Sequence, residues 1–178
     1  MPSKHVALIR GINVGKAKRV AMADLRALVE GLGYSEVRTL LNSGNVVFTA
    51  SGSAAPDAAV RIEEGLAKRL KVPARVTVLA AKELATVVRE NSLHGVATNP
   101  SRLLVSVLFD PADRKRVLPL AKQAWGAERL AIGERAVYIW CPDGVLASKL
   151  SEAVGKELRD GTTTRNWATI LKLHELTA

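Results

Sequence analysis

A chain of 178 residues corresponds to one domain or two small ones, and its 48% of hydrophobic residues can form a packed core, which excludes a disordered protein. The 26 lysines and arginines exceed the 17 acidic residues by nine, so phosphate-bearing or other acidic ligands are the first class to consider. The single cysteine, Cys141, excludes an internal disulfide framework, and three histidines far apart in the chain argue against a regular zinc site. We therefore expect no metal and no cofactor.

The chain has no segment typical of a membrane span or a secretory signal. No apolar run approaches the roughly 20 residues that cross a bilayer. The apolar part of the N-terminal sequence MPSKHVALIRG covers only residues 6–9, whereas a secretory signal needs about 7–15 apolar residues. A single cysteine also agrees with a reducing compartment. We expect a soluble, cytoplasmic protein with no membrane partner.

Apolar periodicity in the first half of the chain predicts the element order β-α-β-β-α-β, followed by one more helix. The predicted strands cover residues 5–10, 37–41, 46–49 and 76–79, and the predicted helices cover residues 21–30, 57–70 and 82–90. The second and third strands form a hairpin, because Asn and Gly in the sequence Asn-Ser-Gly-Asn at 42–45 tolerate the positive φ of a tight turn. Small residues at 51–56 predict a loop.

The second half of the chain repeats this order of elements. Its predicted strands cover residues 103–109, 128–132, 136–140 and 162–164, and its predicted helices cover residues 113–124, 147–158 and 167–175. The fold class is therefore α+β, with two tandem ferredoxin-like (βαββαβ) modules and additional helices. The modules are expected at residues 1–92 and 101–178, the latter including the terminal helix, and a polar linker is expected at 93–100.

The motifs that would identify an enzyme are incomplete. The sequence GINVGK begins at Gly11 and follows a strand, as a phosphate-binding loop does, but it has three residues between its glycines where the nucleotide-triphosphatase motif has four. Ala17 also stands where that motif has the Ser or Thr that holds magnesium. Ser43 lies in no nucleophile elbow, and Cys141 has no neighbouring histidine in the sequence. We therefore predict no catalytic residue.

Strand direction predicts a candidate anion site. In a ferredoxin-like sheet the end of the first strand and the hairpin between the second and third strands share one edge. Glycines let main-chain N–H groups converge on an anion, and neighbouring Arg and Lys add positive charge. The candidate ligand-binding residues at this edge are Arg10, Gly11, Asn13, Gly15, Lys16, Ser43, Gly44 and Asn45.

Each candidate position also has a purely structural interpretation. The glycines and asparagines can serve only to form turns, and the basic residues can be solvated surface charges. A second candidate pair, Arg165 and Asn166, precedes the last predicted helix. Asn166 can cap that helix, and Arg165 beside a helix N-terminus favours an anion, but a capped helix that docks through Trp167 explains the same residues.

The quoted motifs closely resemble a bacterial family catalogued as domain of unknown function 1697. The resemblance covers nearly the whole chain and rests on RGINVGK, MADLRALVEGLGY, TLLNSGNVVF and TTTRNWATILKL. It implies an α+β fold with two ferredoxin-like modules and no established activity. The chain departs from the usual pattern at Lys16, where a second glycine is common, and at Asn42, where an aromatic residue and Gln usually precede SGN. The matching positions are Arg10, Gly11, Asn13, Gly15, Ser43, Gly44, Asn45, Arg165, Asn166, Trp167 and Thr169.

Three functions follow from the sequence. The first is binding of an anionic, phosphate-bearing small molecule at the predicted edge. The second is a nucleic-acid-binding module, which the net charge of +9 favours and the scarcity of aromatic residues disfavours. The third is an enzyme that acts through main-chain, Asn and Arg electrostatics, although the sequence offers only an unplaced carboxylate such as Asp24 as general base.

Overall fold

The structure is a computed structural model that describes residues 1–52 and 55–178. The predicted loop at 51–56 lies partly outside the described residues. The chain folds into two compact units, one formed by Met1–Leu84 with Leu173–Ala178 and the other by Ala85–Lys172. These spans differ from the expected modules, because the last six residues group with the first unit and residues 85–92 with the second.

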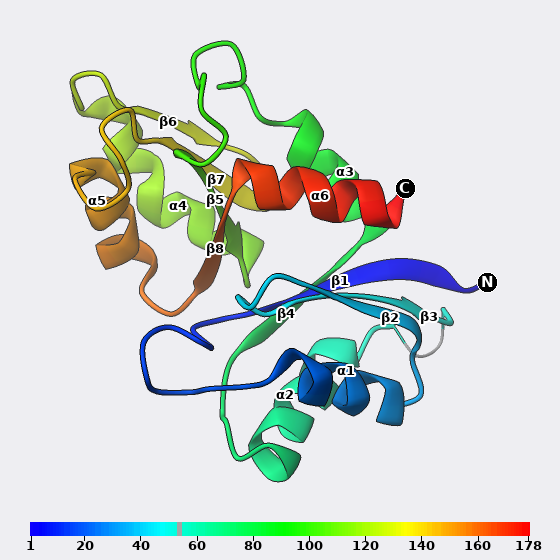
Figure 1. Cartoon of the computed structure of the whole chain (residues 1–178). Helices are drawn as coiled ribbons and strands as arrows, with labels where there is room; N and C mark the ends of the chain where they lie inside the picture. The colour runs from blue at the N-terminus through cyan, green and yellow to red at the C-terminus, as the bar shows by residue number, and fades with distance from the viewer. Residues whose placement is uncertain (53–54) are drawn as a thin grey trace. The chain divides into compact units, whose positions relative to one another are not determined.

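The first unit contains a four-stranded antiparallel sheet with the strand order β2-β3-β1-β4 (Figure 1). Two helices, α3 and α6, have residues in both units. The elements are β1 (Ser3–Ile9), α1 (Met22–Gly31), β2 (Ser35–Leu40), β3 (Asn45–Ala50), α2 (Ala58–Arg69), β4 (Val76–Ala80), α3 (Ala81–Arg89) and α6 (Trp167–Thr177).

The core of the first unit lies between its sheet and the helices α1 and α2, which cover one face of the sheet (Figure 1). Alternate strand residues such as Ile9 and Phe48 face the helices, because successive side chains of a strand point to opposite faces. The helices approach each other at Gly65, where an added Cβ would lie 2.7 Å from the Cδ1 atom of Leu28. The glycine thus lets α1 and α2 pack closely over the sheet.

The second unit contains another four-stranded antiparallel sheet, with the strand order β6-β7-β5-β8. Its core joins β5 and β7 to α4, α5 and a 3-10 turn, and buried Cys141 belongs to this core. The elements are β5 (Leu103–Leu108), the 3-10 turn η1 (Pro111–Asp113), α4 (Arg114–Val117), the 3-10 turn η2 (Leu118–Lys122), β6 (Arg129–Ile132), β7 (Ala136–Trp140), α5 (Lys149–Leu158) and β8 (Thr162–Asn166).

The prediction of one continuous helix at residues 113–124 is wrong. A single turn of α-helix, α4, lies between two 3-10 turns, each of which has a proline in its first turn. Pro119 has no N–H to donate and its ring clashes with the preceding helical turn, so the chain cannot continue as a regular α-helix. The other predicted strands and helices are confirmed in type and order, with shifted ends; the strand predicted at 162–164, for example, extends to Asn166.

Candidate functional site

One asparagine side chain holds the base of the loop between β1 and α1. The Asn13 carboxamide oxygen accepts a hydrogen bond from Val20 N at 2.8 Å, and the carboxamide nitrogen donates to Val20 O at 2.9 Å. The same nitrogen donates to Asn42 O in the β2–β3 hairpin at 2.7 Å. Asn13 N donates to Lys18 O at 2.9 Å. Asn13 therefore closes the loop and ties it to the hairpin, which leaves no side-chain N–H for a ligand.

The loop presents main-chain N–H groups that have no acceptor. φ is positive at Gly11 (71°), Asn13 (58°) and Gly15 (68°) but not at the residues between them. Such alternation is a feature of the main-chain concavities that bind anions. Within the described part of the chain, Asn13 N has an acceptor, whereas five neighbouring N–H groups have none: those of Gly11, Ile12, Val14, Gly15 and Lys16.

The β2–β3 hairpin lies against the base of this loop. Ile9 N donates to Gly44 O at 2.9 Å. Gly44 has a φ of 86°, and a Cβ at this position would lie 3.0 Å from Ile9 Cβ and 3.1 Å from Ile12 Cδ1. Both the conformation and the close contact explain why a glycine occupies position 44. Gly44 thus lets the hairpin and the loop meet at one end of the sheet.

Asn45 stabilises the hairpin from within. The residue is fully buried at the start of β3, opposite Leu8 of β1. Its carboxamide nitrogen donates to Leu40 O at 2.9 Å and to Ser43 Oγ at 3.0 Å. The predicted turn is therefore shifted, because Asn45 belongs to the strand and its side chain bonds to the turn. These contacts give Asn45 a structural role beside the candidate site.

Positive charge is concentrated on the loop. Lys16, Lys18 and Arg19 are exposed, and Arg10 is half-buried where β1 ends. The sequence contains no Asp or Glu between Arg10 and Arg19. Arg19 donates from its Nη1 atom to Gly15 O at 3.2 Å.

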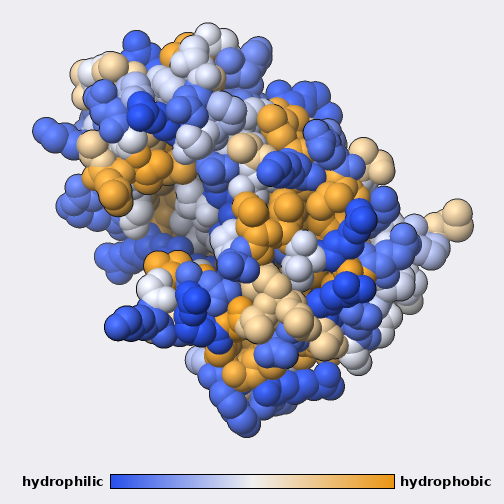
Figure 2. All heavy atoms as spheres, in the orientation of Figure 1, coloured by the Kyte–Doolittle hydropathy of each residue, from blue (hydrophilic) through white to orange (hydrophobic). Residues whose placement is uncertain are grey.

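Hydrophilic residues cover much of the visible surface of the molecule, with apolar patches between them (Figure 2).

Arg75 is a further cation at this end of the sheet, and the sequence interpretation missed it. Arg10 N donates to Arg75 O at 2.9 Å. Because β4 runs antiparallel to β1, the residue that precedes β4 must lie beside the end of β1, and this relationship could have indicated Arg75. A carboxylate is also present nearby, since Glu63 Oε1 accepts a hydrogen bond from Val76 N at 2.7 Å.

A cavity of about 310 Å³ adjoins the Asn13 contacts. It lies between the start of α1 and the hairpin, and Arg19 is the charged residue that lines it. The other lining residues are Asn13, Val20, Ala21, Met22 and Asn42. Its volume is at the lower end of the roughly 300–1,000 Å³ that is typical of small-molecule sites.

Arg165 and Asn166 belong to the second compact unit, whereas the other eight candidate residues belong to the first. Arg165 is 8% exposed and donates from Nη1 to Thr163 Oγ1 at 2.7 Å and to Thr164 O at 2.9 Å. Burial lowers the pKa of Arg165 to about 10, so the guanidinium stays protonated at neutral pH. Asn166 Oδ1 accepts a hydrogen bond from Thr169 N at 2.9 Å, which confirms that Asn166 caps α6.

Three further features concern chemistry outside the candidate site. Among the described residues, no group of three or more His, Cys, Asp or Glu side chains is arranged to hold a metal ion. The described helices also include none with the length and apolar character that a membrane span requires. Burial raises the pKa of the Cys141 thiol, so the reactive thiolate is disfavoured at neutral pH.

The geometry defines an α+β protein with two four-stranded antiparallel sheets and six α-helices among the described residues. The chain belongs to the family described as protein of unknown function (DUF1697), whose model matches residues 2–138. The motif at residues 162–173 lies beyond the matched segment. No curated protein matches the chain.

A solved structure supports the same fold. The conserved bacterial protein SP0830 from Streptococcus pneumoniae is 21% identical to this chain, and the alignment covers 100% of both chains with a TM-score of 0.77. At this identity the likeness concerns the fold alone.

Proposed function

We propose that the protein binds an anionic, phosphate-bearing small molecule where the β1–α1 loop meets the β2–β3 hairpin. The observation that carries this proposal is the alternating φ between Gly11 and Gly15, together with five described N–H groups that lack acceptors. Four of these groups belong to exposed residues, whereas Ile12 is buried in the core. N–H donors without acceptors on exposed residues of a cationic loop suit phosphate oxygens, which accept several hydrogen bonds at once.

The proposal assigns different roles to the candidate residues. The N–H groups of the loop and the ammonium groups of Lys16 and Lys18 contact the anion, and the Arg10 guanidinium adds charge where β1 ends. Asn13, Gly44 and Asn45 hold the loop and the hairpin in place, because their polar groups and packing are already committed to the chain. The site therefore depends on a rigid support, formed by Asn13, Gly44 and Asn45, and on the exposed, cationic part of the β1–α1 loop.

A titration with inorganic pyrophosphate tests this assignment. We expect pyrophosphate to shift the amide resonances of Gly11, Gly15 and Lys16. In calorimetry, the double variant Lys16→Gln/Lys18→Gln should bind at least about tenfold more weakly, because two charge-assisted contacts are lost.

The matched control is Lys68→Gln/Lys115→Gln, which removes the same charge from exposed lysines of α2 and α4. If this control keeps the parent's affinity for pyrophosphate, the anion is bound by the loop lysines and not by the net charge alone. Equal weakening by both double variants would reduce the effect to net charge, and the absence of amide shifts in residues 11–16 would refute the proposal.

A nucleic-acid ligand is the alternative, and the exposed lysines of the loop favour it. The run of residues from Arg10 to Arg19 contains no aromatic side chain on which a base could stack. We therefore place the small anion first. The salt dependence of oligonucleotide binding separates the two ligands.

We also propose that both sheets are ferredoxin-like and that the protein is cytoplasmic. The strand order β2-β3-β1-β4 and the connectivity β-α-β-β-α-β support the first classification, and the second sheet has the corresponding order β6-β7-β5-β8. The unpaired, buried Cys141 agrees with a reducing compartment.

A further inference from the structure

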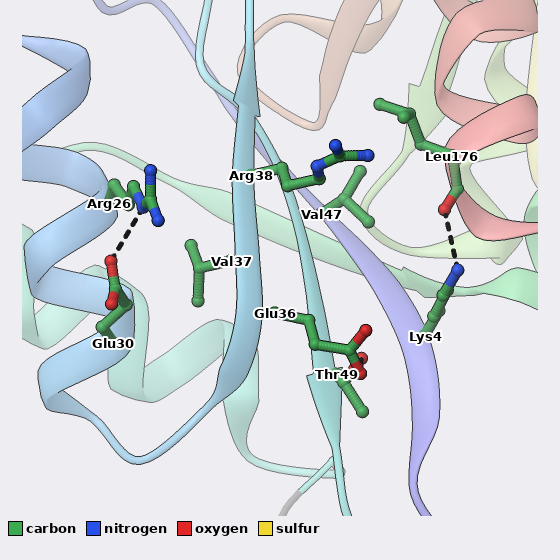
Figure 3. A pocket seen from close by; sticks show the side chains of 9 residues that line it. All are labelled: Lys4, Arg26, Glu30, Glu36, Val37, Arg38, Val47, Thr49 and Leu176. Atoms are coloured by element: carbon green, nitrogen blue, oxygen red, sulfur yellow. Dashed lines mark hydrogen bonds and ion pairs between the residues drawn. The ribbon is translucent and has the colours of Figure 1, made fainter.

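A second cavity, of about 420 Å³, borders strand β2 at the edge of the first sheet (Figure 3). Its size falls within the roughly 300–1,000 Å³ that is typical of small-molecule sites. All the residues that line it belong to the first compact unit, and none of them is a residue of the candidate anion site.

Three charged side chains line the cavity on the side of β2 that faces away from α1. Lys4 comes from β1, and Glu36 and Arg38 come from β2. Glu36 and Arg38 project from the same side of β2, while Val37 between them points toward α1 (Figure 3). The ladder between β2 and β3 is irregular between Ser35 and Arg38, and Glu36 has a φ of 51°. Such irregularities redirect side chains and are frequent beside binding sites.

The opposite charges in this cavity do not neutralise one another. Glu36 Oε1 accepts a hydrogen bond from Thr49 Oγ1 at 3.2 Å, and Lys4 Nζ donates to Leu176 O at 3.4 Å. Among the described residues, the Arg38 guanidinium has no hydrogen-bond or ion-pair partner, and Glu36 forms no ion pair with Lys4 or Arg38.

On the other side of β2, two charges are already paired. Arg26 Nε lies 2.9 Å from Glu30 Oε1 on α1, and Figure 3 shows this pair across the strand from Arg38. Because Arg26 and Glu30 form an ion pair with each other, the lining charges that form no ion pair with any described residue are those of Lys4, Glu36 and Arg38. Two apolar side chains also line the cavity, Val47, which is 3% exposed, and the half-buried Leu176.

We propose that this cavity binds a small zwitterion, an α-amino acid with an aliphatic side chain. Arg38 and Lys4 bind its carboxylate, since a guanidinium forms paired hydrogen bonds with a carboxylate. Glu36 binds its ammonium group. The aliphatic side chain lies against Val47 and Leu176. A zwitterion satisfies both signs of charge at once, whereas a simple anion or a simple cation leaves one of them unpaired.

The test compares three probes of similar shape: L-leucine, 4-methylpentanoate, which lacks the ammonium group, and 3-methylbutylamine, which lacks the carboxylate. We expect L-leucine to shift the amide resonances of Arg38 and Thr49 and to bind about tenfold more tightly than either analogue, because each analogue loses one charge-assisted contact. Equal affinities for the three probes, or unchanged amide resonances, would overturn the proposal.

Variants test the roles of the individual charges. Arg38→Gln should lower the affinity for L-leucine about tenfold. The matched control Arg69→Gln, at an exposed arginine outside the lining of the cavity, should leave this affinity unchanged. Glu36→Gln should lower the affinity for L-leucine, because its ammonium group loses a partner. The same variant should raise the affinity for 4-methylpentanoate, because the carboxylate that repels this anion is gone. The same direction of change for both probes would contradict the assigned role of Glu36. Pyrophosphate binding by these variants should match that of the parent, which separates this site from the anion site.

Discussion

At the scale of single residues, asparagine side chains that suit ligand binding are used for architecture. The Asn13 carboxamide joins both ends of its loop and the hairpin, and the Asn45 carboxamide bonds within its turn. A short amide can do this because it offers donors and an acceptor close to the main chain. The candidate site therefore depends on these residues for its shape, and the contacts with the anion fall to main-chain N–H groups and lysines.

Replacement of Asn13 tests this architectural role. Asn13→Ala should lower the free energy of unfolding by about 2–4 kcal/mol, since three side-chain hydrogen bonds are lost and alanine tolerates positive φ less well. Urea denaturation measures the change. Asn42→Ala is the control, because the hydrogen bond from Asn13 ends on the main-chain oxygen of Asn42, and its cost should stay below about 0.5 kcal/mol. Equal losses in the two variants would contradict the role of the Asn13 side chain.

At the scale of elements, local capping explains part of the motif TTTRNWATILKL. Asn166 ends β8 and caps α6 through Thr169 N, so one residue both stops a strand and starts a helix. Arg165 lies within the strand and bonds to Thr163 and Thr164. The region around Pro119 shows the opposite effect, because a residue without an N–H divides a predicted helix into short turns.

The cap predicts a specific pattern of substitutions. Asn166→Ala should lower the free energy of unfolding by about 1 kcal/mol, because Thr169 N loses its acceptor, whereas Asn166→Asp should preserve the cap. Amide exchange at Thr169 should be faster in Asn166→Ala than in Asn166→Asp. Identical exchange in the two variants would show that the side-chain cap does not protect the start of α6.

At the scale of the whole molecule, the excess of nine positive charges is a property of the surface and not of the fold. Part of this charge is clustered on the β1–α1 loop, at the exposed side chains of Lys16, Lys18 and Arg19. A small anion requires only such a local cluster. A nucleic acid would contact phosphates over a longer path and would release a counterion at each contact.

The salt dependence of binding to a single-stranded oligonucleotide separates these cases. Three loop cations alone predict a slope of about −2 for log K against log salt, and Lys16→Gln/Lys18→Gln should reduce its magnitude by about 1.4. Lys68→Gln/Lys115→Gln should leave the slope unchanged. A much steeper slope, of about −5, would extend the contact surface beyond the loop and favour the nucleic-acid function.

The sequence by itself determined the order and type of nearly all elements and the place of the hairpin, although Asn45 belongs to the strand and not to the turn. Periods of 2 and 3.6 residues and the preferences of Gly, Asn and Pro are local properties, so they can be detected without a fold. The break at Pro119 was detectable from the same local rules, although the apolar spacing of residues 113–124 suggested a continuous helix. The family was also evident from the motifs.

Only the tertiary structure decided which polar groups remain available. The donors and the acceptor of the Asn13 side chain form hydrogen bonds with Val20 and Asn42. Strand pairing brings Arg75 beside Arg10, although the two residues are 65 positions apart in the chain. The cavity near Arg38 likewise joins β1, β2, β3 and the end of α6, which are remote in the chain. Hydrogen-bond satisfaction and charge pairing depend on distances between such remote residues, and a one-dimensional pattern does not contain those distances.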